Sequence, residues 1–412
     1  MPATLRRVVI TGLGALTPYG AGKEVFWEGL TARPPAIRRV TAFDTTGLAV
    51  QIAAEVPDFE PDQFMDRKVA RRSGRFIQMG VAAARMALQD AGLEPSLDDE
   101  IGVYVGTSAA FFTFADEIAR SQARGWERLD PFYLTRESAH MGAARIGLAL
   151  GLRGPNTTVN SACASGLDAI GQAVSTLRLG HAAMMLAGGS EATTQPYALA
   201  LMAFIGALTK SFNDNPTRAS RPFDRCRDGF VIAEGAGMLL LETLEHAVAR
   251  DAHIYAEVLG TGWSFDANND TAPSSAGEVL AMRRALRDAG IDEREVDAVK
   301  AHATSTVLGD PTETAAIKMV LGERAHRVPV VAPKSKIGHA LAASGGVEAV
   351  ASALMVERQT LVPTANLEHP DPACDLDYVA EGPRPATIDT LLQNAFGLGG
   401  QNACMVLRRW RE

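Results

Sequence analysis

The sequence is poor in cysteine, in aromatic residues and in lysine. Four cysteines occur in 412 residues, and none forms a C-x-x-C pair or lies at zinc-ligand spacing from a histidine. This excludes a disulfide framework and predicts no metal site. Aromatic residues make up 6% of the chain, and lysine supplies 7 of its 40 basic residues. The net charge of −8 argues against a general nucleic-acid-binding surface.

Long hydrophobic runs are also missing. The longest apolar stretch, Tyr197–Leu208, has 12 residues, whereas about 20 are needed to span a bilayer. The N-terminal segment lacks the apolar region of a signal peptide, so we expect a cytoplasmic protein with no membrane partner. The composition is otherwise that of a globular chain, with 47% hydrophobic and 21% charged residues. The length predicts two to three domains.

Predicted strands and helices alternate along the chain. Amphipathic segments at Gln78–Ala91 and Gly277–Ala289 repeat apolar residues at helical spacing. Short apolar or β-branched runs predict strands at Arg7–Ile10, Ile101–Val105, Thr157–Val159, Met184–Leu186, Met238–Leu241, Ile254–Leu259 and Val328–Val331. Such alternation favours an α/β fold with largely parallel strand pairing.

An internal repeat divides the chain. The segment ALQDAGL at 87–93 returns as ALRDAGI at 285–291, and each copy is followed by an acidic loop, a strand and a Thr-Ser pair. A strand, tight loop and small-residue helix also recur, at 157–174 and 328–353. Two matches in the same order predict duplicated halves, at residues 1–250 and 251–412. No linker separates the halves, so we expect them to share one interface.

Cys163 lies in the segment NSACASG, where a predicted strand leads through small residues into a helix. Unpaired N–H groups and the helix dipole would favour a thiolate there, so we expect a thiol pKa below about 8.5. The same N–H groups can bind an oxyanion. A lone cysteine is more often buried and inert, but the strand–turn–helix context favours a nucleophile.

Two histidines follow predicted strands, His302 in AHATST and His339 in PKSKIGHA. The α/β folds gather reacting groups at the carboxyl ends of strands, although either histidine alone could be structural. Lys334 lies near the second histidine, and its alternative is a solvated loop charge. The segment NAFGLGGQN around Phe396 predicts either a plain hairpin or a loop that turns a backbone N–H toward a reacting carbonyl.

In this order the motifs resemble those of the decarboxylating condensing enzymes of the thiolase superfamily. The similarity extends from Val8 to Leu407 and includes ASRPFD, RDGF and EGAG between residues 219 and 237. The chain looks most like the elongating β-ketoacyl–acyl carrier protein synthases of type II, and almost as much like ketosynthase subunits of type II polyketide synthases. The resemblance implies a five-layered αβαβα sandwich of two duplicated halves.

The resemblance also implies an acyltransferase activity. Cys163 would take the acyl chain as a thioester, while His302 and His339 would hold the malonyl thioester carbonyl as carbon dioxide leaves. This decarboxylative Claisen condensation would give a 3-oxoacyl–acyl carrier protein in fatty-acid or polyketide elongation. A thiolase would need a second cysteine as base, and Cys404 lies in a predicted apolar strand. A non-catalytic chain-length subunit would lack the nucleophile.

Other residues match supporting positions of the family. Lys334, with Glu313 nearby, would fix His339 and the local charge, although Glu313 could equally be a helix N-terminal acid. The N–H groups of Cys163 and Phe396 would form the oxyanion hole, with Phe396 as the gate. The positions that bind the pantetheine arm are matched by Thr304 and Thr306.

Three positions depart from the family pattern. Ala303 stands where the family usually has Gly, and Leu398 where it has a second aromatic residue. Ala109 stands where a larger aliphatic side chain often limits the acyl pocket, so we expect a pocket open to long or rigid chains. The alternative is that the phenylalanines at 111, 112 and 114 refill the space.

The resemblance implies an acyl carrier protein as partner, which brings its own phosphopantetheine, so no cofactor is expected. Carrier proteins of this kind are acidic and this chain is net negative, so docking needs a local basic patch. The densest basic run, which could also be a solvated helix face, comprises Arg67, Lys68, Arg71, Arg72 and Arg75. The apolar stretch 197–208 predicts a dimer, either a homodimer or a heterodimer with a ketosynthase-like chain-length factor.

Overall fold

A large mixed sheet runs through the computed structural model, which describes residues 5–94, 100–108 and 110–411. Its central strand order is β11-β10-β14-β15-β9-β1-β8-β7-β5-β6, and β2 pairs with β1. The strands are β1 (Val8–Thr17), β2 (Gly20–Ala21), β5 (Ile101–Gly106), β6 (Asn156–Val159), β7 (Met184–Ala192), β8 (Glu234–Thr243), β9 (Ala256–Phe265), β10 (Ala298–Lys300), β11 (Val330–Val331), β14 (Thr390–Gly397) and β15 (Gln401–Arg409).

The sheet consists of two equivalent halves. The order β1-β8-β7-β5-β6 in the first half has the same sequence of pairings as β9-β15-β14-β10-β11 in the second, two antiparallel and then two parallel. The halves meet where β1 pairs with β9 over two residues, Val9 with Glu257 and Ile10 with Ala256. The duplication inferred from the repeat is therefore present in the strand pairing.

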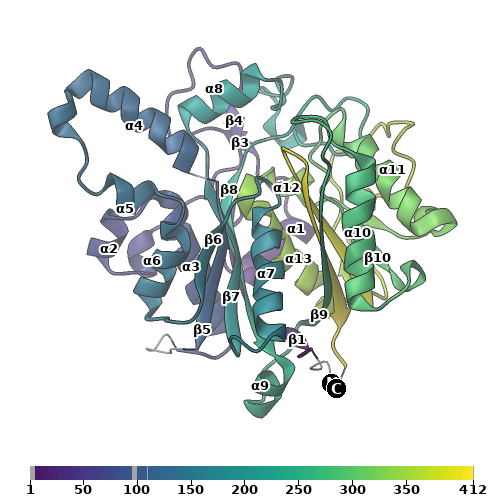
Figure 1. The fold of residues 1–412 in the computed structure, drawn as a ribbon. Helices are drawn as coiled ribbons and strands as arrows, with labels where there is room; N and C mark the ends of the chain where they lie inside the picture. Colours follow the sequence, from purple (N-terminus) through teal and green to yellow (C-terminus); the bar gives the residue numbers. More distant parts are fainter. Residues whose placement is uncertain (1–4, 95–99, 109, 412) are drawn as a thin grey trace.

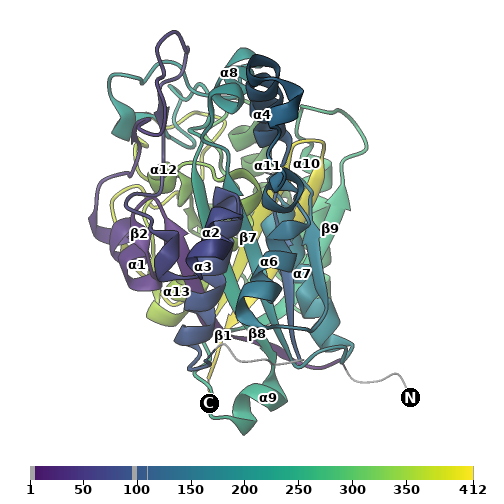
Figure 2. The same cartoon turned by 90° about the vertical axis from the view of Figure 1, so that its left-hand side faces the viewer.

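Helices cover and separate the two half-sheets (Figures 1 and 2). Helices α3 and α6 pack on the outer face of the first half, α10 and α11 form the outer layer of the second, and α7 and α13 pack together between them. The longer helices are α1 (Lys23–Ala32), α3 (Arg75–Asp90), α4 (Ala110–Arg124), α6 (Met141–Leu150), α7 (Ser165–Arg178), α8 (Pro196–Phe204), α10 (Ser275–Ala289), α11 (Gly309–Leu321) and α13 (Ser344–Arg358), and the shorter ones are α2 (Arg67–Arg71), α5 (Tyr133–Glu137), α9 (Leu244–Ala249) and α12 (Lys334–Ile337).

Glycines bring the outer helices unusually close to the sheet at equivalent places in the two halves. A Cβ atom added to Gly14 of β1 would lie 1.8 Å from the carbonyl oxygen of Ala83 in α3. A Cβ added to Gly262 of β9 would lie 2.3 Å from the carbonyl oxygen of Ala281 in α10. Any side chain at these strand positions would force the helix away from the sheet, because packed interiors have no room to spare.

Every predicted strand overlaps an observed one and both predicted helices are present, but the expectation of largely parallel pairing is wrong. Within each half, the first three strands pair antiparallel and only the last two pairings are parallel. Alternating patterns of strands and helices do not show that β7–β8 and β14–β15 are antiparallel neighbours. In the part of the chain that the structure describes, no helix is long and apolar enough to cross a membrane.

Candidate active site

Three loops at the same edge of the sheet bring a thiol and two imidazoles together. Cys163 lies between β6 and α7, His302 follows β10, and His339 follows α12. The Sγ atom of Cys163 is 3.1 Å from Nε2 of His339, and the two imidazole rings stand nearly perpendicular with centroids 5.4 Å apart. Both histidines are buried. The sequence-predicted nucleophile and histidines thus form one cluster.

Burial determines the protonation of this cluster. It raises the pKa of the Cys163 thiol to about 11, outweighing the backbone N–H groups and the Lys334 charge that act in the opposite direction. The expected lowering of this pKa is therefore wrong, because α7 begins two residues later, at Ser165, and the thiol is desolvated. Burial also holds the pKa values of His302 and His339 well below their usual range. At neutral pH the thiol and both imidazoles are uncharged.

Ser344 gives His339 the freedom to act as an acceptor or a donor. The Nδ1 atom of His339 is 2.9 Å from the hydroxyl oxygen of Ser344, at the start of α13. A hydroxyl group both donates and accepts, so it supports either imidazole tautomer. With Nδ1 protonated, Nε2 can accept the Cys163 proton, and with Nε2 protonated it can donate to a substrate oxygen. Ser344 is not among the residues predicted from the sequence, where its one signal is its position five residues after His339.

His302 is held through its backbone. The carboxylate of Glu313 accepts hydrogen bonds from the N–H groups of His302 (2.7 Å) and Ala303 (2.8 Å), and Lys334 Nζ donates to the His302 carbonyl oxygen (2.7 Å). The direct contact of Lys334 is therefore with His302, whereas the expectation was that it would fix His339. Its charge still contributes to the lowered pKa of His339.

Two residues adjacent to the reacting side chains have strained backbone conformations. Ala162, immediately before Cys163, has φ 51°, and Ala303, immediately after His302, has φ 40°. Both are in the left-handed region, which costs a non-glycine residue of order 1–3 kcal/mol. The two hydrogen bonds to Glu313 hold the Ala303 turn in place. This conformation explains why glycine is the expected residue at position 303.

The backbone N–H that faces the thiol belongs to Leu398, not to Phe396 as expected. The Leu398 N–H and the N–H of Cys163 itself both act to lower the pKa of the thiol, so the two groups face the sulfur and together can bind an oxyanion there. Phe396 is still within β14, paired with Asn402, and its ring packs 5.8 Å from that of His302. The side chain of Leu398 is 58% exposed. The predicted oxyanion donor is therefore displaced by two residues along the loop, whereas the role of Phe396 as a gate stays a prediction.

The other predicted site residues are distributed around this cluster. The hydroxyl oxygens of Thr304 and Thr306 lie 3.1 Å apart in the loop after His302. Ala109 lies outside the described residues. A carboxyl group that the sequence analysis missed, Glu191 at the end of β7, is buried, accepts two hydrogen bonds from Ser108 and has its pKa raised to about 7 by burial.

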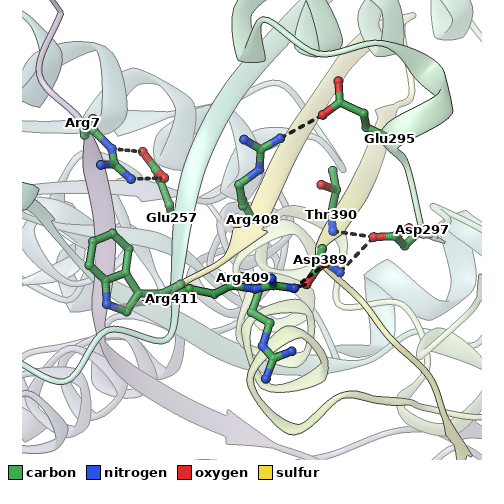
Figure 3. Close-up of a pocket in the computed structure, with 10 residues that line it drawn as sticks. Arg7, Glu257, Glu295, Asp297, Asp389, Thr390, Arg408, Arg409 and Arg411 are labelled. Atoms are coloured by element: carbon green, nitrogen blue, oxygen red, sulfur yellow. Dashed lines mark hydrogen bonds and ion pairs between the residues drawn. The ribbon is translucent and has the colours of Figure 1, made fainter.

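A separate cavity of about 550 Å³ lies at the opposite end of the β14–β15 hairpin (Figure 3). Three of its four arginines are paired with carboxylates, Arg7 with Glu257, Arg408 with Glu295 and Arg411 with Asp389. Its lining residues include no cysteine, histidine or serine. The reacting groups are therefore those around Cys163.

Comparison with known proteins agrees with this geometry. Residues 5–247 match the family described as "Beta-ketoacyl synthase, N-terminal domain", and residues 255–368 match its C-terminal domain. The chain is 42% identical to a 3-oxoacyl-[acyl-carrier-protein] synthase 2 of Synechocystis sp., over 98% of this chain and 99% of that one.

Two solved structures are similar over nearly the whole chain. The ishigamide ketosynthase/chain length factor has a TM-score of 0.93 and 37% identity, covering 99% of this chain and 100% of that one. A type II polyketide ketosynthase, bound to a hexaketide and solved with its acyl carrier protein, has a TM-score of 0.90 and 33% identity, covering 98% and 100%.

The 3.1 Å contact between thiol and imidazole leads to a test with a small alkylating reagent. At pH 7.5 we expect His339→Ala to slow alkylation of Cys163 by iodoacetamide about 100-fold, because the neutral thiol loses its proton acceptor. Mass spectrometry of the Cys163 peptide measures the rate. His302→Ala is the matched control and should change the rate less than about threefold. Equal effects of the two substitutions would contradict the assignment of His339 as the acceptor.

Proposed function

The chain belongs to the beta-ketoacyl synthase family, and we propose that its Cys–His–His cluster carries out acyl transfer to Cys163 followed by condensation with a malonyl group on an acyl carrier protein. The product is a 3-oxoacyl–acyl carrier protein, two carbons longer than the starting acyl chain. The observation that carries this proposal is the contact between Cys163 and His339, with His302 perpendicular beside it.

In the first half-reaction the thiol becomes a nucleophile. His339 Nε2 accepts the Cys163 proton, and the sulfur attacks the acyl thioester carbonyl of the incoming carrier. The N–H groups of Cys163 and Leu398 stabilise the oxyanion. The carbon–sulfur bond to the carrier breaks, and the departing pantetheine thiolate takes the proton from His339. The acyl chain is then a thioester on Cys163.

In the second half-reaction the malonyl carboxylate leaves as carbon dioxide. Its bonding electrons form an enolate, whose oxygen accepts hydrogen bonds from the neutral imidazoles of His302 and His339. One such donor contributes about 3 kcal/mol of transition-state stabilisation. The enolate carbon attacks the Cys163 thioester, the carbon–sulfur bond breaks, and the released Cys163 thiolate takes up one proton from solvent, which balances the negative charge of the malonyl carboxylate. The lowered pKa values of the histidines keep them as neutral donors.

The two alternatives are disfavoured by particular residues. A thiolase needs a second cysteine as base, but Cys404 is buried in β15, where its thiol donates to the Asn394 side-chain oxygen (3.3 Å). Burial raises the Cys404 pKa well above its usual value. A non-catalytic chain-length subunit would not retain Cys163 and both histidines in contact.

A condensation assay tests this function directly. Incubation with an acyl carrier substrate should place the acyl group on Cys163, and adding malonyl carrier should release a 3-oxoacyl carrier detectable by intact-mass spectrometry. Cys163→Ala should abolish condensation but retain slow malonyl decarboxylation, because both histidines remain. An adduct on Cys226, Cys374 or Cys404 that survives Cys163→Ala would overturn the assignment. Acyl groups trapped from a panel of carriers would distinguish fatty-acid from polyketide elongation.

The carrier is proposed to dock on the basic surface of α2. Three basic residues are exposed on this helix, and the next, Arg72, packs its guanidinium 4.5 Å from the Phe132 ring centroid. The three are Arg67, Lys68 and Arg71. Arg75, expected in the same run, is in α3 and donates two hydrogen bonds to the buried Glu234 carboxylate. Its charge is therefore paired within the chain and is not counted in the docking surface. The related ketosynthase solved with an acyl carrier protein supports this class of partner.

Charge reversal should separate docking from chemistry. We expect Arg67→Glu with Arg71→Glu to raise KM for acyl carrier substrates about tenfold at low salt, because an acidic partner loses two attractive charges. Turnover of short pantetheine thioesters should stay unchanged. A control pair, Arg283→Glu with Arg287→Glu on α10 in the opposite outer layer, should leave KM unchanged. An equal loss with both substrate types would show that the α2 residues serve structure alone.

A dimer is proposed from apolar side chains that the chain leaves exposed around α4 and α8. These two helices contact each other, and α4 projects from the body of the molecule (Figure 1). Phe204, in the stretch expected to be buried on every side, is 86% exposed. The other exposed apolar side chains of this surface are Phe114, Trp126, Leu129, Leu134, Tyr197 and Ile205. The similar ketosynthase/chain length factor leaves a heterodimer as the alternative to a homodimer.

Sedimentation of the purified chain tests the dimer. We expect a dimer, and Phe204→Glu should shift it toward monomer, because a charge would be buried without a partner. Leu179→Glu replaces an exposed apolar residue at the end of α7 and should have no effect. A wild-type monomer without activity would point to a missing heteromeric partner, whereas a fully active monomer would contradict dimerisation.

Three other expectations from the sequence remain predictions. They are pantetheine binding by Thr304 and Thr306, the open pocket at Ala109 and the cytoplasmic location.

A further inference from the structure

Two buried lysines hold one buried carboxylate behind the histidines. Lys334 Nζ lies 2.5 Å from one carboxylate oxygen of Glu348, and Lys300 Nζ donates a short hydrogen bond to the other. The side chains of all three residues are at most 1% exposed. The two positive charges therefore share a single negative partner out of contact with solvent.

Each ammonium group also holds a backbone carbonyl of the active site. Lys334 donates to the His302 carbonyl oxygen, and Lys300 donates to the Asn394 carbonyl oxygen, both at 2.7 Å. Asn394 lies in β14, four residues before Leu398, whose N–H faces the Cys163 sulfur. One carboxylate thus connects the strand that leads to the oxyanion donor with the loop that carries His302.

We propose that Lys300 of β10 is a positioning residue for the condensation. Its ammonium group neutralises Glu348, so that Lys334 keeps its hydrogen bond to the His302 carbonyl oxygen. It also fixes the position of β14, the strand that leads to the Leu398 N–H. This inference rests on the proposed function. Without the Lys300 ammonium, Lys334 would be the only counterion of a buried carboxylate, and the β14 carbonyl would lose its donor. Such a change leaves the reacting side chains in place but disturbs their alignment and electric field.

The charges around Lys300 agree with this role. Burial lowers its pKa to about 8 despite the Glu348 carboxylate, and its charge helps to lower the pKa values of His302 and His339. Other titratable groups that interact with it are Lys334 of α12, Glu313 of α11 and Cys404 of β15. The charge of Glu278 in α10 acts in turn on Cys404, whose pKa it helps to raise. Above pH 8 Lys300 loses its proton, and the positive field at the site weakens.

Malonyl-carrier decarboxylation measured from pH 6 to 10 tests this role. We expect the wild-type kcat to fall above about pH 8. Lys300→Met should lower kcat about 10- to 100-fold at pH 7 with KM nearly unchanged, and its residual rate should show no inflection near pH 8. Lys300→Arg keeps a charge at every pH, so it should recover much of the rate and also lack the fall above pH 8.

Lys336 provides a matched control. It is also buried, its pKa is also lowered to about 8 by burial, and its Nζ donates to the Leu30 carbonyl oxygen at 2.8 Å. Lys336→Met should therefore keep the wild-type rate and pH profile. The proposal is overturned if Lys300→Met retains the wild-type profile, or if Lys336→Met removes the fall above pH 8.

Two further measurements keep the test decisive. If circular dichroism shows that Lys300→Met or Lys300→Arg does not fold, Lys300→Gln retains a donor without the charge and should show the same loss of rate. The rate of Cys163 alkylation reports the basicity of His339 without any carrier substrate, and it should rise in Lys300→Met, because loss of the Lys300 charge raises the pKa of the imidazole that accepts the thiol proton. A wild-type chain that decarboxylates nothing would overturn the proposed function, while the alkylation profile would still test Lys300.

Discussion

Burial of His302 and His339 beside the partly buried Cys163 is the constraint on which the rest of the site depends. Desolvation keeps the thiol and both imidazoles uncharged, so sulfur must lose its proton to a neighbouring nitrogen rather than to solvent. The same desolvation strengthens every N–H donor that faces the reacting carbonyls. The charged groups that support the site do not touch the reacting atoms. Lys334, for example, contacts His302 only at its backbone carbonyl oxygen, to which it donates a hydrogen bond. The site therefore separates neutral reacting groups from charged groups that hold them.

Close packing of the central helix α13 against the sheet makes this separation possible. Gly346 of α13 and Gly237 of β8 approach so closely that a Cβ on Gly346 would lie 2.3 Å from the Gly237 carbonyl oxygen. With no side chains between them, α13 and the sheet form a dense wall behind the site, and Glu348 is on this helix. A looser wall would admit water to the carboxylate and its lysines, and the buried charges would then no longer be focused on the histidines.

Much of this could be predicted from the sequence, because motif order reports on topology. Cys163, His302 and His339 were found through their strand-to-loop contexts, and the comparisons confirm the fold class and the condensing activity. The predictions that were wrong depended on distances between residues that are far apart in the sequence, or on burial. The sign of the Cys163 pKa shift followed from burial, and the oxyanion donor moved from Phe396 to Leu398 because β14 continues through residue 397. No local pattern shows that Lys300 meets Glu348, 48 residues away.

The antiparallel meeting of β1 with β9 gives the molecule an approximate twofold axis, since these are equivalent strands of the two halves. Under that symmetry β6 corresponds to β11, so the loop that carries Cys163 is the counterpart of the segment that leads to Lys334 and His339. The nucleophile and its proton acceptor are thus symmetry mates that have diverged into opposite roles. The two halves thus share a fold but differ in chemistry, and neither half alone contains both the nucleophile and its proton acceptor.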